Sequence, residues 1–482
     1  MSWRRLLALI AGPVVFVLLA HLAPATLPDA AARVLGVAGW MAVWWLAEPV
    51  PLGATSLLPL ALFPVLGVTS AADAAAPYAN ELVFLFLAGF LLAAALRCWN
   101  AHSRIAYALI AFIGTGERRV VLGVMVATAF ISMWISNTAT AAMMYPIVIA
   151  IAELASDGEG SANLRTSLIL GMAFAASIGG IATLIGTPPN LIFAGAAEQL
   201  LGRPVGFVPF LLIGLPIALI LLPVAWFLLV FVLFPSRVSF GSEAAREMAE
   251  RRRALGPLRG GERTTVIVFA LTALAWLVRE PKRFGTFTMP GIASFAPHVT
   301  DASIGILSAV VLFVLAGRSQ DGTRRPLLSW AEAREIPWEV LLLFGGGLSL
   351  AAAMESSGLA TWLGAAMAGL RAYPVWVVYL GLAALVVLLS ELASNTATAS
   401  MIMPIAVSLA HAIGRPPLTL MLIAALAASG GFALPVATPP NTIAFASGHV
   451  SARQMARAGL LLDVVTIGLV VVAAMTIAHV VL

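Results

Sequence analysis

Two short polar motifs, each present twice, interrupt apolar segments of the chain. Ser-Asn-Thr-Ala-Thr occurs at residues 136–140 and again at 394–398, and Thr-Pro-Pro-Asn occurs at 187–190 and again at 438–441. Hydroxyl, carboxamide and main-chain carbonyl oxygens are hard donors that suit a small hard cation. Free N–H groups at a helix N-terminus suit an anion. We therefore expect these motifs to build one site for a cation and an anion.

Each motif taken singly has an ordinary structural interpretation. A lone Ser-Asn-Thr in a membrane helix more often forms interhelical hydrogen bonds, and a lone Pro-Pro more often makes a kink. Here both motifs occur twice and in the same order. The matched pairs favour a site built from two halves of a duplicated protein.

Neighbouring residues extend the candidate cation sites. Ser132 lies one helical turn before Ser136, and Ser390 lies one turn before Ser394, so each pair of hydroxyls can face the same gap. Gly186 and Ala437 precede the threonines of the second motif and leave room for a main-chain carbonyl to approach an ion.

Other residues carry weaker signals. Glu391, next to Ser390, fits a proton- or ion-binding carboxylate, and a structural pair or an exposed residue at the hairpin base fits it equally well. The six histidines are scattered, and Cys98 is the only cysteine, which excludes an intramolecular disulfide and a cysteine metal cluster. We expect no transition metal, cofactor or nucleic acid. Without paired aspartates in facing spans, a His-Glu-x-x-His motif or an evident serine–histidine dyad, we do not expect an enzyme.

The composition predicts a polytopic membrane protein. Of the 482 residues, 61% are hydrophobic and 10% are charged, against roughly 25% charged in soluble domains. The segments that flank each Ser-Asn-Thr motif are about 16 residues long, or roughly 24 Å as helix, which is short of a 30 Å hydrocarbon core. We therefore predict re-entrant hairpins at 119–153 and 374–413, which leaves about eleven transmembrane helices.

The basic residues orient this topology. With the N-terminus inside and the C-terminus outside, 20 of the 27 Lys and Arg residues fall in inside loops, where basic residues are enriched. The seven predicted outside are Arg33, Arg203, Arg279, Lys282, Arg283, Arg371 and Arg415.

An internal repeat organises the chain. Glu81 matches Glu339 and Asn137 matches Asn395 at one spacing (339 − 81 = 258 and 395 − 137 = 258). Thr187 matches Thr438 at a slightly shorter one (438 − 187 = 251). An odd number of crossings separates the copies, so we predict inverted repeats that meet at a midplane site, with helices broken there.

The motifs as a group resemble the divalent anion:sodium symporter (DASS) family. The similarity runs over nearly the whole chain and includes Phe-Leu-Phe-Leu-Ala-Gly-Phe at 84–90 and Thr-Pro-Pro-Asn-Thr-Ile-Ala-Phe at 438–445. The resemblance implies a homodimer in the inner (plasma) membrane, in which a scaffold part anchors a moving transport part. It implies sodium-coupled symport of dicarboxylates such as succinate, malate or fumarate by an elevator mechanism.

Residue roles follow from the same resemblance. The implied sodium-binding residues are Ser132, Ser136, Asn137 and the Gly186 carbonyl for one ion, and Ser390, Ser394, Asn395 and the Ala437 carbonyl for the other. The implied substrate-binding residues are Asn137, Thr138, Thr187 and Pro188 on one side, and Asn395, Thr396, Thr438 and Pro439 on the other. Position 390 is often threonine in the family, and serine keeps the oxygen.

The implied organisation divides the chain into five segments. They are a scaffold part at 1–118, a transport part at 119–235 (hairpin 119–153, broken helix 165–200), a cytoplasmic linker at 236–263, a second scaffold part at 264–372 and a second transport part at 373–482 (hairpin 374–413, broken helix 417–447).

Several alternatives remain at this stage. The motifs do not separate symporters from relatives that exchange one dicarboxylate for another, nor dicarboxylate from citrate or sulfate. A cation-coupled antiporter of a related branch, such as an arsenite efflux protein, is disfavoured by the paired Ser-Asn-Thr motifs. A channel is disfavoured because binding sites at the tips of two hairpins, in a duplicated unit that moves, favour alternating access.

Overall fold

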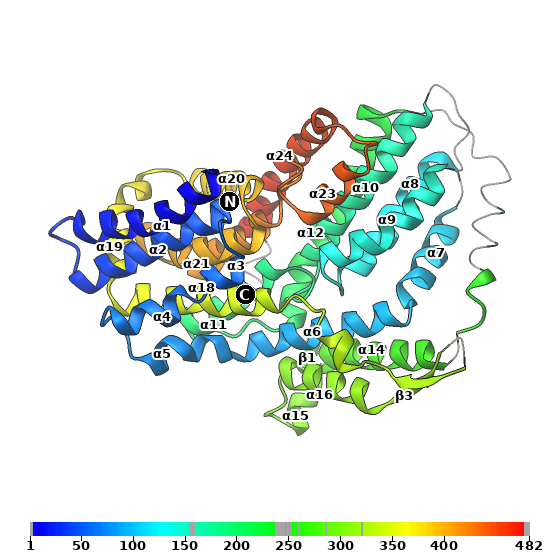
Figure 1. Ribbon diagram of the computed structural model, residues 1–482, viewed down its shortest axis with the longest axis horizontal. Helices are drawn as coiled ribbons and strands as arrows, with labels where there is room; N and C mark the ends of the chain where they lie inside the picture. Colours follow the sequence, from blue (N-terminus) through cyan, green and yellow to red (C-terminus); the bar gives the residue numbers. More distant parts are fainter. Residues whose placement is uncertain are drawn as a thin grey trace.

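The computed structural model describes residues 3–114, 116–153, 160–236, 246, 250, 253–258, 260–284, 287–319 and 322–476. Helices carry nearly all of this structure (Figure 1). The first half contains α1 (Trp3–His21), α2 (Asp29–Ala47), α3 (Leu52–Thr55), α4 (Leu58–Val65), α5 (Ala71–Ala75), the 3-10 turn η1 (Ala76–Ala79), α6 (Glu81–Cys98), α7 (Ala101–Ile113), α8 (Glu117–Ser132), α9 (Asn137–Glu153), α10 (Ser161–Ile181), α11 (Pro188–Leu201), α12 (Phe207–Phe227) and the π-helical turn η2 (Leu228–Leu233).

The second half repeats much of this order. It contains α14 (Gly260–Val278), β1 (Lys282–Phe284), β2 (Phe287–Met289), α15 (Ile292–Phe295), α16 (Asp301–Val314), β3 (Ala316–Arg318), β4 (Arg324–Pro326), α17 (Trp330–Ala333), α18 (Trp338–Ser356), α19 (Leu359–Ala366), the 3-10 turn η3 (Ala368–Ala372), α20 (Val375–Leu392), α21 (Asn395–Ile413), α22 (Pro417–Ala428), α23 (Pro439–Ala446) and α24 (Ala452–Thr476). The strands form two antiparallel pairs, β1–β2 and β3–β4. The all-α prediction did not include these two small sheets.

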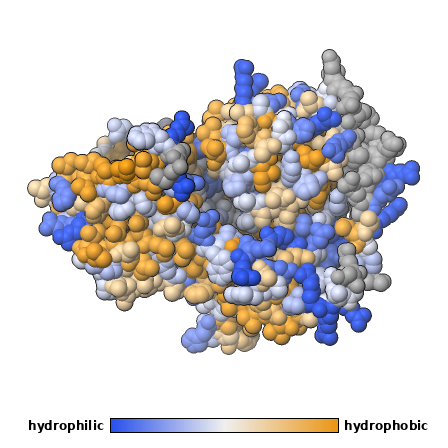
Figure 2. All heavy atoms as spheres, in the orientation of Figure 1, coloured by the Kyte–Doolittle hydropathy of each residue, from blue (hydrophilic) through white to orange (hydrophobic). Residues whose placement is uncertain are grey.

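The prediction of a polytopic helical membrane protein is confirmed. Within the described residues, ten helices are long and apolar enough to cross a membrane. Figure 2 shows apolar side chains over much of the visible surface. Large apolar residues on the long helices are exposed, as lipid contact requires: Leu7, Leu219, Leu271, Leu388 and Val464 are each at least half exposed.

Two stretches are shorter or less regular than a single spanning helix. A two-residue turn at 56–57 separates α3 from α4, and Tyr78 donates its hydroxyl to the main-chain carbonyl of Ser56 there. Helix α16 has 14 residues, and the chain enters the strand β3 at Ala316, directly after the C-cap residue Leu315.

The helices around the Ser-Asn-Thr motifs fold as two helix pairs. Helices α8 and α9 both pack along α10, and α20 and α21 both pack along α22. Because both arms of a pair lie on one helix, the chain reverses direction at the motif between them. Helix α10 is almost entirely buried in the protein, so the two pairs enclose the central helices.

A buried carboxylate joins three helices at one end of the molecule. Asp301, which is 6% exposed, accepts hydrogen bonds from Phe207 N–H (3.0 Å) and from Arg279 Nε (2.5 Å). Trp276 Nε1 donates to the main-chain carbonyl of Asp301 (2.9 Å). Asp301 thus fixes the starts of α12 and α16 against the end of α14.

We expect Asp301→Ala to lower the thermal stability of the purified protein. The substitution leaves the Phe207 N–H without its acceptor and removes one of the two carboxylates that Arg279 contacts, the other being Glu280 (2.5 Å). An unsatisfied buried donor alone costs about 1–3 kcal/mol. Thermal unfolding in detergent measures the loss. Asp29→Asn is the control, because Asp29 is exposed in the first turn of α2. An unchanged melting temperature for Asp301→Ala would contradict this role.

Candidate functional site

At the first helix pair, three oxygens converge where α8 ends and α9 begins. Ser132 Oγ lies 2.9 Å from Asn137 Oδ1 and 2.6 Å from the carbonyl oxygen of Ala176 on α10. Ser132 is fully buried. The Ser hydroxyl carries one proton, so the cluster has more acceptors than donors.

The second helix pair repeats this arrangement with matching Ser and Asn residues, and its carbonyl comes from one residue later in the central helix than the repeat spacing predicts (176 + 251 = 427). Ser390 Oγ lies 2.6 Å from Asn395 Oδ1 and 2.5 Å from the carbonyl oxygen of Ala428 on α22. Ser390 is also fully buried. Each repeat therefore presents a hydroxyl, a carboxamide oxygen and a main-chain carbonyl at one point, which is a donor set for a hard cation.

The Asn that ends each Thr-Pro-Pro-Asn motif holds the adjacent helix break in shape. Asn190 Nδ2 donates to the carbonyls of Gly180 (2.9 Å) and Thr183 (2.7 Å). Asn441 Nδ2 donates to the carbonyls of Phe432 (3.2 Å) and Leu434 (3.0 Å). Among the described residues, the Oδ1 atoms of both Asn side chains are buried without a hydrogen-bond partner. We predicted no role for Asn190 and Asn441 from the sequence, although their fixed place in a duplicated motif was a signal.

Glycines bring the helix breaks against the motif residues. A Cβ atom at Gly180 would lie 2.3 Å from Asn137 Oδ1, and one at Gly186 would lie 2.5 Å from the Gly180 carbonyl. The segment around Gly186 therefore packs against Gly180, which itself packs against Asn137. We call the turn between the two helices of each pair its tip, so Gly186 lies close to the first tip. In the second repeat, a Cβ at Gly431 would contact both the Ser390 carbonyl (3.3 Å) and Ala437 Cβ (3.4 Å). The structure therefore brings Gly186 and Ala437 close to the two tips.

The remaining candidates lie at the tips with fewer contacts. Ser136 Oγ accepts a hydrogen bond from Ala139 N–H (3.4 Å), and Ser394 is the residue before the first turn of α21. Thr187 and Thr438 are buried, and Thr438 Oγ1 accepts from Asn441 N–H (3.3 Å). The remaining four candidates lie in the first turns of α9, α11, α21 and α23. Thr138 and Pro439 are exposed, Pro188 is half-buried and Thr396 is buried.

At the implied substrate site, a helix of each repeat packs against a helix of the other repeat. Helix α23, which begins at Pro439, packs against α9, which begins at Asn137. Helix α11, which begins at Pro188, packs against α21, which begins at Asn395. Among the described residues, no hydrogen bond joins the candidates of one repeat to those of the other. The N-termini of the four helices offer N–H groups to an anion.

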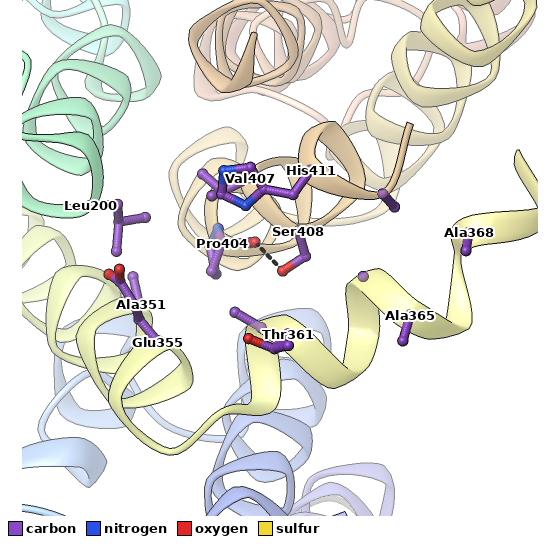
Figure 3. Close-up of a pocket in the computed structure, with 13 residues that line it drawn as sticks. Leu200, Ala351, Glu355, Thr361, Ala365, Ala368, Pro404, Val407, Ser408 and His411 are labelled. Carbon is purple, nitrogen blue, oxygen red and sulfur yellow. Dashed lines mark hydrogen bonds between the residues drawn. The ribbon is translucent and has the colours of Figure 1, made fainter. Parts of the chain in front are cut away.

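Two cavities lie between the helix pairs and their surroundings. The smaller one, about 40 Å³, is lined by Ser136 of the first tip and by the Arg97–Glu335 ion pair (3.1 Å). The larger one, about 540 Å³, lies between α18–α19 and α21 (Figure 3). Its polar lining residues are Glu355, Thr361, Ser408 and His411. The larger cavity contains no residue of the Ser-Asn-Thr or Thr-Pro-Pro-Asn motifs, so cavity size does not mark the motif site.

The fold and these clusters define a multi-pass helical membrane protein with a duplicated, oxygen-lined pair of helix breaks. The family model described as "Sodium:sulfate symporter transmembrane region" matches residues 1–482. The chain belongs to this sodium:sulfate symporter (DASS) family. The predicted resemblance is thereby confirmed, and the protein is a membrane transporter rather than an enzyme.

Curated relatives cover almost the whole chain. The sodium-dependent dicarboxylate transporter SdcS of Staphylococcus saprophyticus is 38% identical over 479 residues, which are 97% of this chain and 91% of that protein. SdcS of Staphylococcus aureus is 37% identical over 473 residues, 96% of this chain and 89% of the relative.

Solved structures of other transporters share the fold at low sequence identity. The Alcanivorax borkumensis YdaH transporter aligns with TM-score 0.57 and 13% identity, covering 88% of this chain and 89% of its own. Neisseria gonorrhoeae MtrF aligns with TM-score 0.58 and 14% identity, covering 98% and 94%. At this identity the likeness concerns the fold alone.

Proposed function

We propose that the protein is a sodium-coupled symporter of dicarboxylates such as succinate, malate or fumarate. The observation that carries the proposal is the repeated cluster at Ser132–Asn137 and Ser390–Asn395, where the same three kinds of oxygen converge in both repeats. The SdcS relatives, named as sodium-dependent dicarboxylate transporters, support the choice of ion and substrate.

In this proposal the two clusters are the sodium sites. Ser132, Ser136, Asn137 and the Gly186 carbonyl bind one ion, and Ser390, Ser394, Asn395 and the Ala437 carbonyl bind the other. The dicarboxylate lies between them, against Asn137, Thr138, Thr187 and Pro188 on one side and Asn395, Thr396, Thr438 and Pro439 on the other.

The charge of the site gives the coupling mechanism. The four motifs contain no Arg or Lys, and Arg97, which lines the cavity beside Ser136, is paired with Glu335. A dianion entering between the motifs therefore meets no uncompensated positive side chain, only helix N-termini. Bound sodium ions supply that charge, and substrate affinity therefore depends on sodium by linkage. If net positive charge crosses with the substrate, each elementary charge adds about 2.3 kcal/mol of driving force per 100 mV.

Elevator movement is the transport mechanism we propose, and an offset between the repeats supports it. Ala93 and Arg97 on α6 match Ala351 and Glu355 on α18 at the repeat spacing of 258 (351 − 93 and 355 − 97). The α6 pair shares a cavity with Ser136 and Ala139, at the start of α9. Ala351 and Glu355 on α18 line the other cavity together with residues of α21 between 404 and 412, which match positions 146–154 of the first repeat.

The offset means that the two helix pairs sit at different heights against the matched helices α6 and α18. From position 139 to position 146 is seven residues, or about 10 Å of helix. In the proposed mechanism, the transport part (119–235 and 373–482) slides along the scaffold part (1–118 and 264–372) until the two repeats exchange these positions.

We further propose inverted repeats, about eleven crossings with two re-entrant hairpins, the N-terminus cytoplasmic and the C-terminus outside. Loops that this topology places on one face contact each other, which supports it. Arg104 pairs with Glu262 (2.7 Å), and Arg97 pairs with Glu335, all on the predicted inside face. We place the protein in the inner (plasma) membrane and expect a homodimer on the family resemblance.

The experiment that tests the function is uptake of labelled succinate into proteoliposomes. Three conditions are compared: an inward sodium gradient, potassium in place of sodium, and internal succinate. Symport predicts uptake that requires external sodium and needs no internal substrate. Uptake only in exchange for internal dicarboxylate would overturn symport in favour of exchange, the second family activity. No succinate uptake in any condition, with sodium-driven citrate or sulfate uptake instead, would overturn the dicarboxylate assignment.

A further inference from the structure

The two helix breaks of the repeats are not equally long. In the first repeat, α10 continues to Ile181 and α11 begins at Pro188. In the second, α22 ends at Ala428 and α23 begins at Pro439. Residues 429–432 therefore lie outside a helix, whereas the matching residues 178–181 are helical. The longer break frees main-chain N–H groups, and a buried N–H without an acceptor is costly.

Two buried carboxyl groups accept the freed N–H groups. Ala433 N–H donates to Glu391 Oε1 (2.7 Å), and Leu434 N–H donates to Glu391 Oε2 (2.7 Å). Phe432 N–H donates to Asp463 Oδ1 (3.1 Å). Glu391 and Asp463 are 5% and 4% exposed. Three consecutive amides are thus held by side chains from two helices, α20 and α24.

The first repeat has no counterpart of these carboxyl groups. The position that matches Glu391 is Met133 (391 − 258), whose main-chain carbonyl accepts the Thr183 hydroxyl instead. A Cβ atom at Gly459 would lie 2.2 Å from the Phe432 carbonyl oxygen, and one at Gly214 would lie 2.4 Å from the Ile181 carbonyl oxygen, so the two glycines occupy matching places. Asp463 lies four residues after Gly459, and the residue four after Gly214 is Ala218. The carboxyl groups therefore serve the second break specifically.

The held amides lead directly to the second cation site. Leu434, fixed by Glu391, accepts hydrogen bonds at its carbonyl from Ala437 N–H (3.2 Å) and from Asn441 Nδ2 (3.0 Å). Ala437 supplies the main-chain carbonyl that we assign to the second sodium site. Glu391 also follows Ser390, so the last turn of α20 presents one residue to the ion and the next to the break.

We infer that Glu391 is a positioning residue, which with Asp463 holds the 432–437 segment so that the Ala437 carbonyl meets Ser390 and Asn395 at the second cation site. The inference rests on the proposed function, because that function assigns the ion. Glu391 does not contact the ion; it sets the cation affinity of the second site through the main chain. The first site lacks this device and does not depend on it.

The test compares two isosteric substitutions with opposite expected results. In Glu391→Gln, the carboxamide oxygen still accepts one of the two N–H groups of Ala433 and Leu434. The NH2 group lies next to the other N–H and cannot accept it, because both are donors. In Asp463→Asn, the amide oxygen still accepts the Phe432 N–H, and the NH2 group can donate to the Glu391 carboxylate. We expect Glu391→Gln to raise the sodium concentration for half-maximal succinate uptake about tenfold, with the maximal rate at saturating sodium retained. Asp463→Asn should stay close to the unmodified protein.

Hydrogen exchange of the purified protein in potassium gives a second readout that needs neither sodium nor transport. Glu391→Gln should exchange faster in peptides covering 429–438 and be unchanged in those covering 182–187. Unchanged sodium dependence and unchanged exchange would overturn the inference and leave the function standing. Sodium-independent uptake by the unmodified protein would overturn the function, and the exchange result would still decide whether Glu391 holds the break. Should Glu391→Gln not fold, Asp463→Ala, which removes the acceptor of one amide only, is measured the same way.

Discussion

Asn137→Ala and Asn395→Ala should each abolish sodium-driven uptake in proteoliposomes. Each Asn contributes the carboxamide oxygen next to the buried hydroxyl of Ser132 or Ser390 (2.9 and 2.6 Å). Each is also assigned to the substrate, so one truncation removes an ion ligand and a substrate ligand together. Leaving a buried polar partner unmatched costs about 1–3 kcal/mol for each group. Because the free-energy losses at the ion and at the substrate add, the two reductions in the uptake rate multiply.

Asn163→Ala is the matched control for both variants. Asn163 lies near the start of α10 and donates to the Pro235 carbonyl (2.9 Å) on the exposed surface, away from both tips. Uptake of labelled succinate is measured at several sodium concentrations, together with the amount of protein inserted in the vesicles. Either tip variant retaining the sodium dependence of the unmodified protein would remove its Asn from the proposed site.

The parts of the fold that the sequence predicted well are those governed by local rules. The polar motif between apolar arms predicted a reversal at each Ser-Asn-Thr. Helices α8 and α20 end just before the motif, and α9 and α21 begin within it, at Asn137 and Asn395. Proline is favoured at the first helical position, and α11 and α23 begin at Pro188 and Pro439. These signals depend on residues within one or two turns of the boundary, so a single sequence contains them.

The start of the second break depends on distant partners and was not predictable. Gly179–Gly180 and Gly430–Gly431 are matched pairs, yet the first is helical and the second is not. The difference lies in Glu391 and Asp463, which are 42 and 31 residues away from the amides they accept. From the sequence we expected Glu391 to be an ion carboxylate, a member of a structural pair or an exposed residue at the hairpin base. The exposed position is wrong, because Glu391 is 5% exposed, and its contacts are two main-chain N–H groups and the Asp463 side chain.

The relation between the repeats and the matched helices α6 and α18 was also beyond the sequence. Repeat spacing aligns Ala93 with Ala351 but says nothing of which part of α9 or α21 each one faces. The cavities supply that information, because α6 lies beside the start of α9 and α18 lies beside the later turns of α21. This difference gives the proposed elevator movement a direct structural test.

Cross-linking Ala93→Cys to Ala139→Cys should stop transport completely. The two positions line the same cavity of about 40 Å³, so a short bifunctional thiol reagent can join them. In the proposed movement α9 slides along α6 by about two turns, and a covalent link across that contact holds one position only. The variant is made in a Cys98→Ser background, since Cys98 is the only native cysteine. Uptake should be lost on treatment and return when a reducible linker is cleaved.

The control pair joins two elements within one part. Phe313→Cys on α16 and Trp330→Cys on α17 replace rings whose centroids are 6.0 Å apart, and both positions fall in the proposed scaffold part at 264–372. The same reagent should link them without stopping transport, because neither element moves relative to the other. Mass spectrometry gives the extent of linking in each case. Full uptake by protein linked nearly to completion between positions 93 and 139 would rule out sliding at this contact, and an elevator mechanism with it.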